Sequence, residues 1–130
     1  MRSLKALSLG ALVAVMALTT AAGYAPKTWT SKTFAGVKAN TGTATATVDG
    51  GTITLKVSDD FVIPDTPAPS WQIVDSKGNT YLLNQFRIKG DKTNRMITLP
   101  SYIKDVAKVQ VWCSFAEVLL GETTFDSVIK

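Results

Sequence analysis

Polar and apolar residues alternate in short runs along most of the chain after Thr28. Alternation with a period of two is typical of strands that bury one face, and turn residues separate the runs about every eight to twelve positions. Many short strands without a helix of ordinary length are typical of a β-sandwich or a barrel. We predict an all-β fold, a single antiparallel β-sandwich, with strands at residues 44–48, 52–58, 71–74, 80–83, 86–89, 95–99, 108–115 and 117–125.

The clearest local signal is a hairpin at Asp49-Gly50, which stands between two alternating runs. A tight type I′ turn needs positive φ at both central positions, and Asp-Gly is among the pairs that supply it. The alternation predicts that Ile53, Leu55 and Val57 point into the core, with Thr54 on the opposite face. Three prolines follow in the interval 64–69, and they predict a loop over residues 65–70.

The N-terminus has the form of a secretory signal peptide. Arg2 and Lys5 precede an apolar stretch at residues 6–18, and small residues follow it up to Ala22. We predict a signal peptide at residues 1–22 and one exported domain at residues 23–130, in the periplasm or outside the cell. The apolar stretch is too short to span a bilayer comfortably, so no membrane span is expected in the mature form.

The charge balance argues against a nucleic-acid partner. The whole chain has 14 Lys and Arg against 10 Asp and Glu. The predicted signal peptide contains two of these bases and none of the acids, which leaves twelve bases against ten acids in the mature chain. A nucleic-acid-binding domain would need a dense basic face.

The chain has no histidine and one cysteine. Histidine is the usual general base and the commonest metal ligand, so its absence disfavours hydrolytic catalysis and an ordinary zinc site. A single cysteine cannot form a disulfide within the chain. In an exported protein, Cys113 is therefore a buried core residue, an intermolecular bridge or a reactive thiol.

Alternation assigns Cys113 to the apolar face of its strand, together with Val111 and Phe115. A buried thiol in apolar surroundings is usually inert, whereas a redox thiol needs a lowered pKa and access for a partner. Trp112 falls on the polar face, and Trp71 follows the proline-rich loop. Both tryptophans are candidate surface-binding residues, because an exposed indole can stack on a partner; alternatively, they cover the core.

Three stretches of the sequence resemble one known domain family. They are TFAGVKANTGTATATVDGGTITLKVSDDF at residues 33–61, PAPSWQIV at 67–74 and AKVQVWCSFAEVLLGETTF at 107–125. Together they resemble the DM-thirteen domain, also described as the electron-transfer domain of Skeletor-type surface proteins. The Trp112-Cys113 pair is the most specific part of the resemblance. The chain departs from the family pattern at Ala68-Pro69-Ser70, where Gly-Pro-Asp is usual.

The resemblance implies a β-sandwich and a redox or electron-transfer role at Cys113. Neither the residues nor the resemblance identifies a cofactor. Any electron partner would be a separate redox or envelope protein, because no second redox domain is fused here. We therefore expect a non-catalytic exported module that engages in electron transfer or thiol redox exchange through Cys113. The alternative is a binding or structural envelope protein that uses an exposed face of the sandwich.

Overall fold

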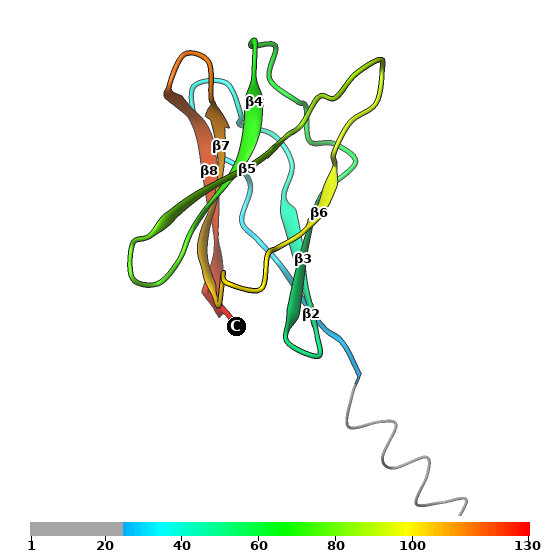
Figure 1. Ribbon diagram of the computed structural model, residues 1–130, viewed down its shortest axis with the longest axis vertical. Coiled ribbons are helices and arrows are strands. Elements are labelled where there is room, and N and C mark those ends of the chain that lie inside the picture. The colour runs from blue at the N-terminus through cyan, green and yellow to red at the C-terminus, as the bar shows by residue number, and fades with distance from the viewer. Residues whose placement is uncertain (1–24) are drawn as a thin grey trace, which may run out of the picture.

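Two four-stranded antiparallel sheets pack face to face (Figure 1). This computed structural model describes residues 25–130, and the predicted signal peptide lies outside them. One sheet has the order β1-β2-β3-β6 and the other β5-β4-β7-β8. Because both sheets are antiparallel and residues 25–130 contain no helix, the predicted β-sandwich is confirmed. The strands are β1 (Lys27–Thr30), β2 (Ala44–Asp49), β3 (Thr52–Val57), β4 (Pro69–Val74), β5 (Thr80–Gln85), β6 (Met96–Thr98), β7 (Val106–Cys113) and β8 (Val118–Ile129).

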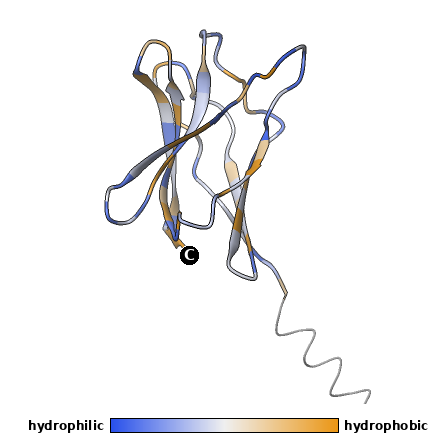
Figure 2. Cartoon of the chain, in the orientation of Figure 1, coloured by the Kyte–Doolittle hydropathy of each residue, from blue (hydrophilic) through white to orange (hydrophobic). Residues whose placement is uncertain are grey.

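The core lies between the inner faces of the two sheets, and apolar and polar stretches alternate along the strands (Figure 2). Each central strand contributes every second residue to it, as a pleated strand requires. The members from β2, β3, β4 and β7 are Ala44, Ala46, Ile53, Leu55, Val57, Trp71, Ile73, Val109, Val111 and Cys113.

The predicted β2–β3 hairpin is present. Asp49 pairs with Thr52, so the two central residues of the turn are Gly50 and Gly51 rather than Asp49 and Gly50. Their φ angles of 58° and 85° explain this choice, because glycine adopts positive φ without a steric cost. Leu55 is fully buried, which confirms the predicted inner face of β3.

Several predicted boundaries were wrong. β4 begins inside the predicted 65–70 loop, because Pro69 needs no backbone N–H at the first position of a strand and its carbonyl accepts the Phe86 N–H at 2.8 Å. Residues 86–89 form no strand, since the buried Phe86 turns into the core and only Arg87 makes an isolated bridge, to Thr93. The alternation did not identify β1, which pairs with β2.

The edge strand β8 is covered over its first half by the segment that precedes β2. Ala35 forms a bridge with Glu122, and the N–H groups of Lys38 and Ala39 both donate to Leu120 O, at 3.0 and 2.9 Å. Gly121 permits this close approach, because a Cβ there would collide with the backbone of Ala39. Covering an edge in this way blocks pairing with another chain.

Candidate functional site

Cys113 is the last residue of β7 and points into the sandwich, with 1% of its surface exposed. It lies opposite Pro69 on β4 and Val118 on β8. The inward orientation predicted from alternation is therefore confirmed. In Figure 1 this end of the sandwich is the upper one, and the C-terminus and the β2–β3 hairpin lie at the lower end. Cys113 is a buried free thiol at the end of its strand, and it belongs to the hydrophobic core cluster.

The turn between β7 and β8 wraps around the sulfur. The Glu117 N–H donates to Cys113 O at 2.8 Å, and Glu117 adopts a left-handed φ of 56° to close the turn. The Ala116 N–H then points at Cys113 Sγ, at a distance of 3.5 Å. The Ser114 N–H donates to Ala68 O at 3.0 Å, which attaches the turn to the loop before β4.

These neighbours hold the pKa of the Cys113 thiol below its ordinary value. The largest cause is the Ala116 N–H, which favours the negative thiolate and outweighs the desolvation that opposes it. The backbone N–H groups of Ala68 and Phe115 and the side chain of Thr66 act in the same direction. Dipoles of the backbone therefore stabilise the thiolate without help from an adjacent cation.

Two arginines anchor the loop that leads towards the thiol. The guanidinium of Arg87 donates to Pro64 O at 2.6 Å and to Ile63 O at 3.1 Å. Arg95 donates to Ser58 O and Phe61 O, at 2.6 and 3.0 Å. Four such bonds from charged donors fix the path of the chain just before Thr66.

The predicted inner position of Phe115 was wrong. Its strand ends at Cys113, so Phe115 lies in the turn and is 77% exposed. Val118 and Leu119 are also exposed, and Leu119 pairs with the partly exposed Trp112 across β7 and β8. We call these four apolar residues the hairpin tip. A cluster of exposed apolar side chains is a common feature of interaction sites.

Trp71 is not a surface-binding residue, contrary to that hypothesis. It is 0% exposed and stacks on Phe86, with ring centroids 4.6 Å apart. Its indole N–H donates to Asn94 O at 2.8 Å, which satisfies the one polar atom of the side chain. The alternative reading, in which this tryptophan covers the core, is correct for Trp71.

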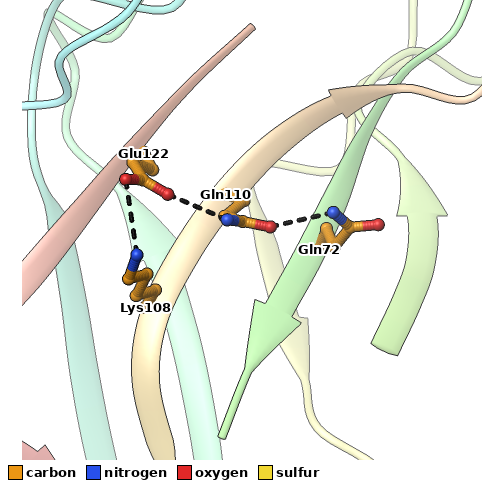
Figure 3. A network of polar contacts seen from close by, with 4 residues as sticks. All are labelled: Gln72, Lys108, Gln110 and Glu122. Atoms are coloured by element: carbon orange, nitrogen blue, oxygen red, sulfur yellow. Dashed lines mark hydrogen bonds and ion pairs between the residues drawn. The ribbon is translucent and has the colours of Figure 1, made fainter. Parts of the chain in front are cut away.

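A row of polar side chains crosses the outer face of the sheet that contains Cys113 (Figure 3). Gln72 donates to Gln110 at 2.8 Å, and Gln110 donates to Glu122 at 2.8 Å. Lys108 lies 3.6 Å from the second Glu122 oxygen. The row joins β4, β7 and β8, so it links three strands of this sheet through their side chains.

Residues 25–130 contain no group of three His, Cys, Asp or Glu side chains that could hold a metal ion. In the same part of the chain, no helix is long and apolar enough to cross a membrane. The chain matches no family model, no curated protein and no solved structure. The resemblance to the DM-thirteen domain therefore stays a prediction.

Proposed function

We propose that this protein is an exported β-sandwich module that takes part in thiol redox exchange or electron transfer through Cys113. The observation that supports the proposal most directly is the Ala116 N–H, 3.5 Å from Sγ. The nucleophilic form of cysteine is the thiolate, and N–H dipoles aimed at the sulfur favour it. The lowered pKa of Cys113 agrees with this geometry.

Thiol–disulfide exchange is the reaction that suits this arrangement. The Cys113 thiolate attacks one sulfur of a partner disulfide, so a new S–S bond forms at Sγ while the partner S–S bond breaks. The released partner sulfur leaves as a thiolate. Cys113 becomes one half of a mixed disulfide and the leaving partner sulfur becomes a thiolate, so one disulfide and one thiolate stand on each side of the exchange and the step balances.

Access to the sulfur requires the 114–117 turn to move, because Cys113 is only 1% exposed in the closed form. Residues 115–117 of this turn are all exposed, and exposed turns open at a small cost compared with global unfolding. The observed exchange rate is then proportional to the fraction of molecules in which the turn is open and to the fraction of Cys113 in the thiolate form. A separate redox or envelope protein is the proposed partner.

The test is exchange between the folded protein and a small aromatic disulfide. We expect stoichiometric release of one aromatic thiol and a mixed disulfide at Cys113, measured by absorbance and by mass spectrometry under native conditions. A Cys113→Ser variant should release none. Exchange that occurs only after denaturation would identify Cys113 as a core residue and would refute the proposal.

A second function is favoured by the hairpin tip. Phe115, Val118 and Leu119 are exposed near the end of β7, and the partly exposed Trp112 pairs with Leu119. They would contribute apolar contact area to a partner protein. In this alternative the protein is a non-catalytic binding module of the cell envelope. The two functions are separable, because Phe115→Ser would weaken partner binding while leaving exchange with a small disulfide intact.

A further inference from the structure

A cavity opens at the end of the sandwich opposite Cys113. In Figure 1 this is the lower end, where the β2–β3 hairpin and the C-terminus lie. The cavity has a volume of about 430 Å³. Pockets that hold small molecules usually measure about 300–1,000 Å³, so there is room for one small ligand. The lining residues that matter here come from both sheets and are Lys27 and Trp29 of β1, Val48 and Asp49 of β2, and Lys130 directly after β8.

One wall of the cavity is aromatic and apolar. In the register between β1 and β2, Trp29 lies opposite the fully buried Ala46, and Lys27 lies opposite Val48. Residues directly opposite each other in an antiparallel pair share a face, so Trp29 and Lys27 both belong to the inner face of β1. Trp29 and Val48 are partly buried and pack against the core. The indole therefore stands where the core ends and the cavity begins.

The cavity also has two lysines without an ionic partner. Lys27 and Lys130 are exposed, and neither forms an ion pair with a carboxylate among residues 25–130, although Asp49 lines the same cavity. Residues 1–24 contain no Asp or Glu that could pair with them. Two ammonium groups against one carboxylate leave the cavity with an excess of positive charge.

This combination of groups selects a class of ligand. A flat apolar ring suits the aromatic wall, because aromatic rings stack on an indole. The two lysines favour a negative group on that ring and oppose a cationic ligand. Asp49 would repel a doubly charged group such as a phosphate, which is a second element of selectivity. A planar ligand with a single negative charge satisfies all three conditions.

We propose that this cavity binds a small aromatic carboxylate, whose ring packs on Trp29 and whose carboxylate is held by Lys27 and Lys130. The inference goes beyond the proposed function of Cys113 and is independent of it, because the two sites lie at opposite ends of the sandwich. The protein then has a small-molecule site in addition to the thiol.

The experiment titrates the ¹⁵N-labelled mature protein with 2-naphthoate and follows the indole N–H signals of its three tryptophans by NMR. Trp29→Phe assigns the signal of Trp29. We expect that signal to shift in a saturable way, while the signals of Trp71 and Trp112 stay in place. The neutral analogue 2-naphthamide should bind more weakly. Added salt should weaken the binding of 2-naphthoate, because exposed charges are screened.

Charge variants test the role of the lysines. Lys27→Gln and Lys130→Gln should each weaken binding about two- to fivefold, as expected for exposed charge pairs, whereas Asp49→Asn should strengthen it by a similar factor. Lys56→Gln, at an exposed lysine of β3 outside the cavity, is the matched control and should bind like the parent. All four substitutions are at exposed positions, so the fold should tolerate them.

Three results would overturn the inference. The first is a Trp29 signal that does not move up to the solubility limit of 2-naphthoate. The second is equal binding of 2-naphthoate and 2-naphthamide, or of the parent and both lysine variants, which would mean that the lysines hold no carboxylate. The third is a stronger response to inorganic phosphate than to 2-naphthoate, which would identify an anion site of a different class.

Discussion

Pro69 lies directly opposite Cys113 in the antiparallel register between β4 and β7. Proline has no backbone N–H to donate to a neighbouring strand, so it is tolerated at the first position of a strand. There the carbonyl of Pro69 can still accept a hydrogen bond. Phe86 donates to that carbonyl at 2.8 Å. This bond ties the start of β4 to the end of β5, and the register with β7 places the same end of β4 beside Cys113.

The two faces of β3 should differ sharply in their tolerance of substitution. Leu55→Ala removes a fully buried side chain from the core and should cost about 2–5 kcal/mol of unfolding free energy. Thr54→Ala, on the outer face, should cost much less. Urea unfolding of both variants measures the difference, and equal losses would mean that the sheet faces are assigned wrongly.

Two phenylalanines provide a matched test of the hairpin tip. Phe86→Ala should lose about 3–5 kcal/mol, because it empties a buried site stacked on Trp71. Phe115→Ala should change the unfolding free energy by about 0.5 kcal/mol or less, since its side chain is 77% exposed. A large loss for Phe115→Ala, measured in the same thermal or urea experiment, would place this residue in the core after all.

Asp75 should contribute stability that disappears in acid. The side chain of Asn79 is the largest cause that holds the Asp75 pKa below the ordinary 3.8, and bonds from Tyr81 and the Asn79 and Lys77 N–H groups add to it. A lowered folded pKa means that the stabilisation is present above the unfolded value and is lost as pH falls through the folded value. The difference in unfolding free energy between the parent and Asp75→Asn should therefore shrink below pH 3.8.

Unfolding of the parent, Asp75→Asn and Asn79→Ala over that acid range checks this account. Asn79→Ala removes the largest cause of the lowered pKa and should weaken the pH dependence. If the difference in unfolding free energy between the parent and Asp75→Asn stayed constant from neutral to acid pH, the Asp75 charge would not be what stabilises the turn.

Export is predicted from the sequence and lies outside the described residues. Intact-mass analysis of the protein recovered from the envelope or medium should give a mature N-terminus at Gly23, without a lipid. A full-length species retained in the inner membrane would contradict the predicted signal peptide.

Period-two alternation predicted the sandwich, the inner face of β3 and the inward orientation of Cys113, because these depend on the pleat alone. It could not show where β7 ends. Glu117 adopts the left-handed conformation without being glycine or asparagine, so the turn carried no sequence signal and Phe115 was assigned to the core.

The thiol site itself depended on contacts that leave no mark in the sequence. Ala116 and Ala68 act on Cys113 through their backbone N–H groups, which every residue except proline has. Trp71 was considered for the surface because it follows the prolines, and only the fold brings Phe86 and Asn94 over it. The sequence likewise does not distinguish the Thr66 hydroxyl from those of the other threonines, because its burial depends on the fold.

The pH dependence of native Cys113 alkylation tests the central claim most directly, with the same protein in denaturant as the reference. The account predicts labelling of the folded protein with a midpoint below that of the unfolded thiol, because the Ala116 N–H and its neighbours favour the thiolate. Labelling confined to the unfolded protein, or a folded midpoint equal to or above the unfolded one, would contradict it.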